Sequence, residues 1–160
     1  MKAILQIGFL ALVIMAQVVP AHAGPFEDGV AAYERGEYAT ALKLLRPLAE
    51  QGVAEAQYKL GDMYDNGLGV PQDETEAVKW FRKAAEQDYG LAQFQLGIRY
   101  LVGRGVPQDY VLAHMWLNIA AAPGDETAEY ARDNAAKLMT PDQIAEAQRV
   151  AREWLAKHQQ

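Results

Sequence analysis

The stretch that decides the fold reads GLGVPQD over residues 67–73, and it returns as GRGVPQD over residues 103–109. The two copies lie 36 residues apart, and the residues around them repeat in the same register. The matched pairs are Leu60 and Leu96, Gly61 and Gly97, Tyr64 and Tyr100, Ala77 and Ala113, and Trp80 and Trp116. Self-similarity at a fixed period of roughly 20–50 residues is typical of stacked-repeat proteins. The pattern therefore predicts a stack of similar units.

Within each copy, the residue types predict a helix end, a turn and a helix start. The first glycine is expected to end a helix, because glycine readily takes the left-handed conformation of a C-cap. The second glycine is expected to hold a positive φ in the turn, and the aspartate to cap the next helix. The residues with these roles are Gly67, Gly69 and Asp73 in the first copy and Gly103, Gly105 and Asp109 in the second. Glu76, three residues after Asp73, completes the pattern of a capping box.

The sequence predicts an all-α fold, a short α/α superhelical solenoid of helix-turn-helix repeats capped by C-terminal helices. The full repeats span residues 53–90 and 91–124, and a shorter helix pair without the glycine-rich loop precedes them at residues 24–52. A glycine inside a helix costs roughly 1 kcal/mol relative to alanine, so Gly61 and Gly97 require a packing reason. Residues 125–160 depart from the repeat pattern and predict a capping helix pair.

The repeat motifs identify a family. They read Ala-x-Gln-x-x-Leu-Gly-x-x-Tyr, Gly-x-Gly-Val-x-x-Asp and Ala-x-x-Trp-x-x-x-Ala-Ala. With them the chain resembles the Sel-one-like repeat (SLR) family, a longer-period relative of tetratricopeptide repeats, closely over residues 53–124 and partly over 26–52. The resemblance implies an adaptor or scaffold for protein–protein contacts, often exported in bacteria. Some exported relatives are cysteine-rich and bind cell-wall or β-lactam ligands, and that comparison fails here because the chain has no cysteine.

The N-terminal segment and the net charge predict the compartment. Residues 1–23 combine a positive start, an apolar run and an Ala-x-Ala ending, which is typical of a secretory signal peptide cleaved after Ala23. A membrane anchor is the alternative for this run. We expect a periplasmic or secreted protein with no membrane attachment after cleavage. The formal net charge of −6 disfavours nucleic-acid binding, which requires a basic face.

Catalytic chemistry has little support in these residues. The chain contains neither serine nor cysteine, which excludes Ser–His and Cys–His nucleophiles. His114 is expected to be structural, and the polar run 62–67 fits a helix end better than a calcium loop. The glycine pairs lack the preceding strand and third glycine of a dinucleotide site. We therefore expect no enzyme activity, no cofactor and no metal.

A partner surface is predicted on the first helix of each unit, which lines the concave face in the related folds. The predicted stripe comprises Tyr58, Asp62 and Asp65 in one repeat and Phe94, Ile98 and Leu101 in the next, continued by Glu27, Ala31 and Glu34. Its partner would be a segment of another exported or envelope protein, with Tyr58 and Phe94 as aromatic anchors. Alternatively, the C-terminal helices cover the stripe. Self-assembly through an open end and binding of a cell-wall or small ligand are the other two functions considered.

Overall fold

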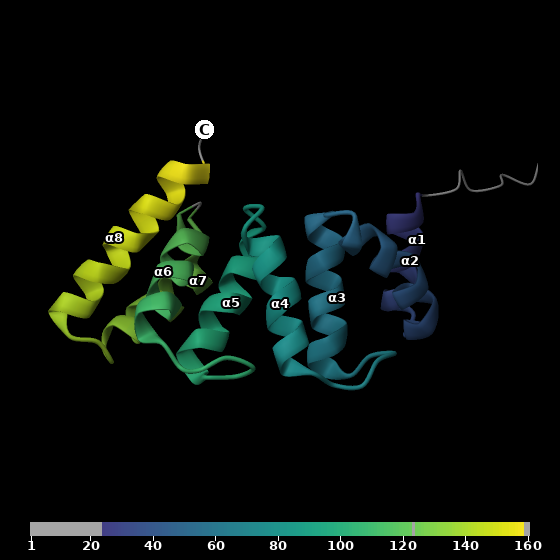
Figure 1. The fold of residues 1–160 in the computed structure, drawn as a ribbon, viewed down its shortest axis with the longest axis horizontal. Helices are drawn as coiled ribbons and strands as arrows, with labels where there is room; N and C mark the ends of the chain where they lie inside the picture. The colour runs from purple at the N-terminus through teal and green to yellow at the C-terminus, as the bar shows by residue number, and fades with distance from the viewer. Residues whose placement is uncertain (1–23, 123, 159–160) are drawn as a thin grey trace, which may run out of the picture.

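The computed structural model describes residues 24–122 and 124–158, and the expected signal peptide lies outside them. Within these ranges the chain forms eight α-helices and no strand (Figure 1). They are α1 (Pro25–Glu34), α2 (Tyr38–Glu50), α3 (Ala54–Asn66), α4 (Glu74–Ala85), α5 (Gly90–Val102), α6 (Tyr110–Ala121), α7 (Glu126–Ala136) and α8 (Pro141–His158). No helix in the described ranges has both the length and the hydropathy required to cross a membrane. The predicted all-α fold is confirmed.

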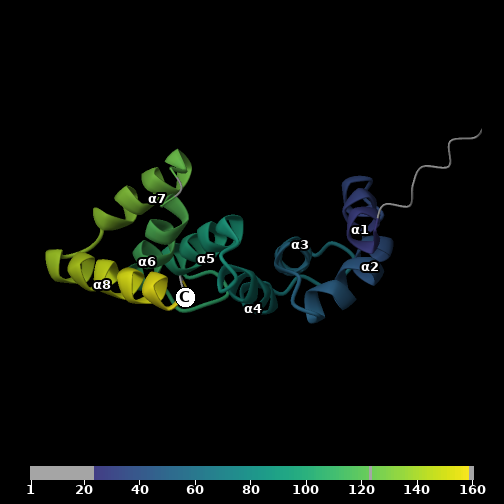
Figure 2. The same ribbon diagram turned by 90° about the horizontal axis from the view of Figure 1, so that it is seen from above.

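The helices pack as three successive hairpins, α1–α2, α3–α4 and α5–α6. Each second helix also packs on the first helix of the next unit, which joins the hairpins into a continuous stack. Viewed from above, α1, α3, α5 and α7 lie along the inner side of a curve, with α1 and α7 at its two ends (Figure 2). The second helices lie on the outer side. The molecule is therefore a short curved solenoid.

The predicted caps begin and end the helices of both full repeats. The carboxylates of Asp73 and Asp109 accept hydrogen bonds from the backbone N–H groups of Glu76 and Leu112, each at 2.9 Å. The first glycine of each loop ends its helix in the left-handed conformation. The capping box at Asp73 is only half formed, however, because the Glu76 carboxylate binds Lys79 Nζ at 2.8 Å instead. Asp73 N–H donates to the carbonyl of Tyr64.

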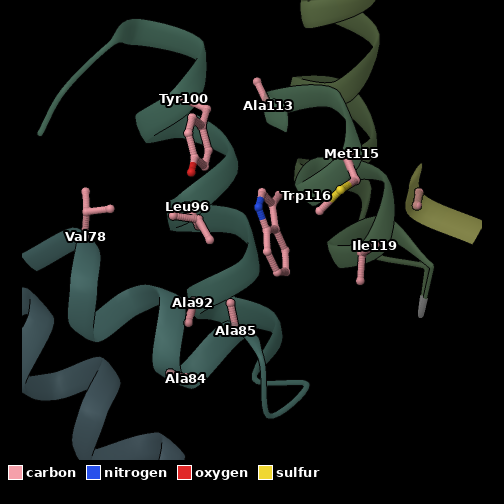
Figure 3. Close-up of a cluster of buried hydrophobic side chains, with 11 residues drawn as sticks. Val78, Ala84, Ala85, Ala92, Leu96, Tyr100, Ala113, Met115, Trp116 and Ile119 are labelled. Carbon is pink, nitrogen blue, oxygen red and sulfur yellow. The ribbon is translucent and has the colours of Figure 1, made fainter. Parts of the chain in front are cut away.

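Close packing between the two helices of each hairpin explains why glycine recurs in mid-helix, at Gly61 and Gly97. A Cβ atom on Gly61 would lie 2.7 Å from Cε1 of Phe81, and one on Gly97 would lie 2.7 Å from Cγ of Leu117. In both hairpins, the second helix therefore approaches so closely that only glycine fits below its large side chain. Figure 3 shows the next layer of the core, where the Trp116 indole extends from α6 toward Leu96 of α5.

The two C-terminal helices, α7 and α8, both pack on α6 at the end of the stack. Helix α7 begins at Glu126, 36 residues after Gly90, so it continues the period as the first helix of a further unit. Helix α8 does not return along it: α7 and α8 diverge, and each packs on α6 (Figure 2). The physical reason lies in α7, where Arg132 and Asp133 replace the Leu-Gly pair that α3 and α5 present to their second helices. Trp154 of α8 instead meets Trp116 edge-on, with ring centroids 5.4 Å apart.

Candidate functional site

The six residues predicted for partner binding lie on α3 and α5, two of the inner helices of the curve (Figure 2), but they have three different environments. Asp65 is buried, Asp62 bridges two units, and Tyr58, Phe94, Ile98 and Leu101 are half-buried.

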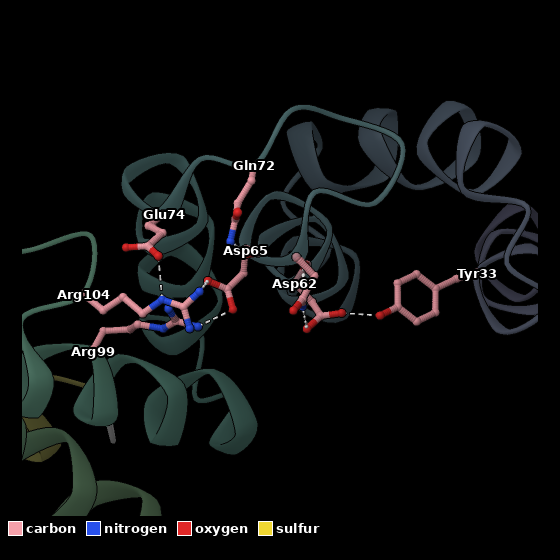
Figure 4. A network of polar contacts seen from close by, with 8 residues as sticks. Tyr33, Asp62, Asp65, Gln72, Glu74, Arg99 and Arg104 are labelled. Carbon is pink, nitrogen blue, oxygen red and sulfur yellow. Dashed lines mark hydrogen bonds and ion pairs between the residues drawn. The ribbon is translucent and has the colours of Figure 1, made fainter.

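Asp65 is not an open acidic contact but the centre of a buried ionic network (Figure 4). Its carboxylate binds the guanidinium of Arg99, and both side chains are less than a tenth exposed. Arg104 Nη2 lies 3.6 Å from Asp65 Oδ1, and Arg104 Nε donates to Glu74 Oε1 at 2.7 Å. A buried carboxylate without a partner is strongly unfavourable, so this arrangement explains why α3 tolerates Asp65 inside the stack. The prediction of Asp65 as a free partner contact is corrected.

The network joins the second unit to the third. The Glu74 hydrogen bond and the Asp65 charge raise the pKa of the Arg104 guanidinium. The Cζ atom of Arg99 also lies 5.8 Å from the Phe81 ring centroid, a distance suited to a cation–π contact. Sequence reasoning did not identify Arg99, although a signal was present: Arg99 stands 36 residues after Met63, a fully buried position. A charge at a core position of a repeat requires a charged partner nearby.

Asp62 connects the first unit to the second. Its Oδ2 accepts the hydroxyl hydrogen of Tyr33 from α1, and its Oδ1 accepts from Asn66 Nδ2 at 3.0 Å (Figure 4). Burial, and then the hydrogen bond to Asp62, raise the pKa of the Tyr33 hydroxyl. Lys59 Nζ lies 4.8 Å from the Tyr33 ring centroid. Much of the carboxylate is therefore engaged within the protein, and the residue as a whole is half-buried.

The two predicted aromatic anchors fill joints between units. The Tyr58 ring lies 5.7 Å from Phe81 and 5.3 Å from Tyr89, and burial raises the pKa of its hydroxyl. Phe94 packs against a group of small residues at the end of α6 and on α7, namely Ala120, Ala121 and Ala128. Leu101 packs against the core cluster that surrounds Trp116. The alternative that the C-terminal helices cover the stripe thus applies to Phe94.

The exposed apolar side chains of α5 lie on a face of the helix adjacent to the one that carries the predicted anchor Phe94. Leu91 and Val102 on α5 are 54% and 58% exposed, and half-buried Ile98 lies between them on the same face. Tyr130 on α7 and Leu138 just beyond it are 70% and 60% exposed. The sequence contained a signal for Tyr130, because Tyr58, Phe94 and Tyr130 follow each other at intervals of 36 residues. Within the described part of the chain, no following unit packs on Tyr130 as the next units pack on Tyr58 and Phe94.

The described ranges show neither a group of metal ligands nor a pocket for a small ligand. His114 is only 3% exposed, its Nδ1 has no hydrogen-bond partner there, and burial lowers its pKa. No three His, Cys, Asp or Glu side chains within 24–122 and 124–158 are grouped to hold a metal ion. No pocket is found among the same residues.

Comparisons with known proteins agree with this geometry. The Sel1 repeat model matches residues 54–89 and 90–125. A protective antigen of uropathogenic Escherichia coli with an SLR fold is 32% identical, with a TM-score of 0.79 over 84% of this chain and 30% of its own. A Sel1 repeat protein from Oxalobacter formigenes is 34% identical, with a TM-score of 0.64 over 67% of this chain and 44% of its own. No curated protein matches the chain.

This chain thus spans less than half the length of either solved relative. Proteins built from Sel1 repeats generally serve as protein-interaction scaffolds, and the fold is typically non-catalytic. The matched repeats begin where α3 and α5 begin, and both solved relatives share the helical stack. The chain belongs to the Sel1-like repeat (SLR) family.

Proposed function

We propose that this protein is a non-catalytic adaptor of the cell envelope that holds a segment of another exported protein on its first-helix face. Export rests on the signal-peptide pattern of residues 1–23. Mass spectrometry of the protein from its native host tests that step, and we expect a mature chain that begins at Gly24.

One observation carries the proposal: the inner face of α5 is apolar where the fold does not require it. Leu91, Ile98 and Val102 occupy the positions that Glu55, Asp62 and Asn66 occupy in α3, 36 residues earlier. Since α3 builds the same hairpin with polar residues there, the exposed apolar residues of α5 have no evident structural role. Exposed apolar groups of this kind typically mark interaction sites.

The alternative of end-to-end self-assembly has weaker support. A stack that continued past α7 would require a second helix along that helix, as in the earlier units. The residues that would receive it are Arg132 and Asp133, which form an ion pair with each other, and a standard hairpin would remove both charges from water. We therefore assign the binding role to the inner face and not to the end of the stack.

The test compares partner capture by the mature chain and by a surface double variant, Leu91→Glu with Val102→Lys. The acidic residue at the start of α5 and the basic residue at its end suit the helix dipole, so folding is preserved. The control is Val53→Glu, which removes an exposed apolar residue at the α3 N-cap. We expect an envelope protein that wild type and control retain and that the double variant loses, with unchanged Tm. Equal capture by all three chains would exclude the α5 face.

A further inference from the structure

Four residues on one face of α5, of which Leu91 and Val102 are exposed and Gln95 and Ile98 half-buried, have the spacing of a seam between two helices. Leu91, Gln95, Ile98 and Val102 follow each other at intervals of 4, 3 and 4 residues. In helix pairs, this alternation of three and four keeps one stripe of side chains directed at a partner helix. The stripe is about 16 Å long at 1.5 Å per residue, or roughly three turns. No helix of the described chain covers it, because Leu91 and Val102 remain more than half exposed.

The surroundings of the stripe are acidic on the side of α3. Toward α3, the corresponding positions carry Glu55 and Asp62. The cation between them, Lys59, lies against the Tyr33 ring. A ligand along α5 would therefore meet apolar groups beneath it and acidic groups on its α3 side.

The position of the stripe favours a single helix over a second copy of this chain. Helix α5 lies on the inner side of the curve, between α3 and α7 (Figure 2). An isolated helix can lie in that position, whereas α5 of a second copy is itself flanked by its own α3 and α7. Two inner faces would therefore meet at their rims before the two stripes came into contact.

We propose that the partner segment binds as an amphipathic α-helix whose apolar stripe packs along α5 and whose basic flank faces α3. This inference rests on the proposed adaptor function and adds the chemistry of the ligand. Apolar side chains of the ligand at the same spacing interlock with Leu91, Ile98 and Val102. Lysine or arginine side chains on the flank approach Glu55, which favours one orientation of the bound helix.

Three fluorescent peptides of identical length test the ligand class against the purified mature chain. The first has leucines at 4-3-4 spacing and lysines on one flank. The second has the same composition with leucines at every other position, as in a strand. The third has the helical pattern with glutamates in place of the lysines. We expect the first peptide to bind at least about tenfold more tightly than either other peptide in fluorescence anisotropy. Its helical circular dichroism should increase on binding.

Protein variants locate the binding site. Leu91→Glu with Val102→Lys should weaken binding of the first peptide about tenfold or more, since both apolar contacts are lost. Glu55→Lys should weaken it less and reduce its salt dependence, because an attractive surface charge is removed. The control Val53→Glu should leave the affinity unchanged. All four chains should remain monomeric in light scattering.

Different outcomes contradict different parts of the argument. Equal affinity for the helical and strand-patterned peptides would overturn the helical ligand, and so would undiminished binding by the double variant. A dimer that the double variant abolishes would show that a second copy covers the stripe. A third outcome is possible: the double variant loses the native partner, but every peptide binds wild type and double variant equally well. That result would support the adaptor function and contradict the helical ligand. Failure to capture any native partner would contradict the adaptor function itself.

Discussion

At the scale of single residues, Gly105 shows how tightly one loop is packed against the preceding unit. Its φ is 74°, and a Cβ atom there would lie 2.3 Å from the backbone oxygen of Glu74. Gly36 has nearly the same φ, 76°, but a Cβ atom there would meet nothing within 4 Å. Substitution of Gly36 therefore measures the conformational cost of a side chain at positive φ, and substitution of Gly105 measures that cost together with a steric clash.

Gly36→Ala should destabilise the protein by about 1 kcal/mol, the cost of a left-handed alanine. Gly105→Ala should cost roughly 1–3 kcal/mol more, because the loop must move away from α4. Urea unfolding of both variants measures the difference. Equal losses of stability would show that the loop does not press on Glu74.

His114 makes the stability of the fold sensitive to pH. Burial lowers its pKa, the charge of Arg132 lowers it further, and Asp133 opposes both. In the unfolded chain the imidazole titrates near its ordinary value of about 6.5. Below that pH the unfolded chain binds a proton that the folded chain does not. Stability is therefore retained above about pH 6.5 and decreases as the pH falls through the window down to the lowered folded pKa.

The variant His114→Val tests this effect, since Val78 occupies the matching buried position one repeat earlier. Wild type should lose stability below about pH 6.5 with a slope up to about 1.4 kcal/mol per pH unit greater than the variant. The free energy of unfolding, measured at a series of pH values in both proteins, gives the two slopes. Parallel curves would mean that His114 is protonated equally easily in the folded chain.

At the scale of elements, the joint between α3 and α5 depends on the buried pair of Asp65 and Arg99. Asp65→Ala should cost about 3–5 kcal/mol, because it leaves a buried guanidinium without its main partner. The repeats themselves offer an apolar replacement. Met63 occupies the position equivalent to Arg99, and Leu101 the position equivalent to Asp65.

The double variant Asp65→Leu with Arg99→Met should therefore recover most of that loss, to within about 1 kcal/mol of wild type or better. A double-mutant cycle by urea unfolding measures the coupling. If the double variant is as unstable as Asp65→Ala, the joint requires the charges for a reason beyond their mutual neutralisation.

The elements also show how far the sequence predicts this structure. Helix ends at Gly67 and Asp73 follow from local backbone chemistry, and the period transfers them to the next unit, so the hairpins were predictable. The Arg99 pairing and the course of α8 were not. Both depend on which residues meet across units, and the repeat pattern gives no contact for a position where one copy departs from the other. For the same reason, the sequence predicted an exposed anchor at Phe94, whereas the structure exposes Leu91 and Val102.

At the scale of the whole molecule, the stack transmits stability only between neighbours. Each unit packs on the next, and α8 packs mainly on α6. In such an arrangement, stability is approximately the sum of the units and their shared interfaces. A defect at the C-terminal end should therefore weaken the nearest unit first and leave the first unit protected.

Trp154→Ala makes such a defect, because it removes the ring that meets Trp116 edge-on and stacks on His158. Trp154 is half-buried, so the loss should lie at or below the lower end of the roughly 3–5 kcal/mol typical of buried tryptophan. Hydrogen exchange with mass spectrometry should show faster exchange in α6 and α8, a smaller change in α5, and none in α1 and α2. Uniformly faster exchange along the chain would instead mean that the solenoid unfolds as one cooperative unit. The inner face of α5 would then open whenever the cap did, and ligand binding there would depend on α8.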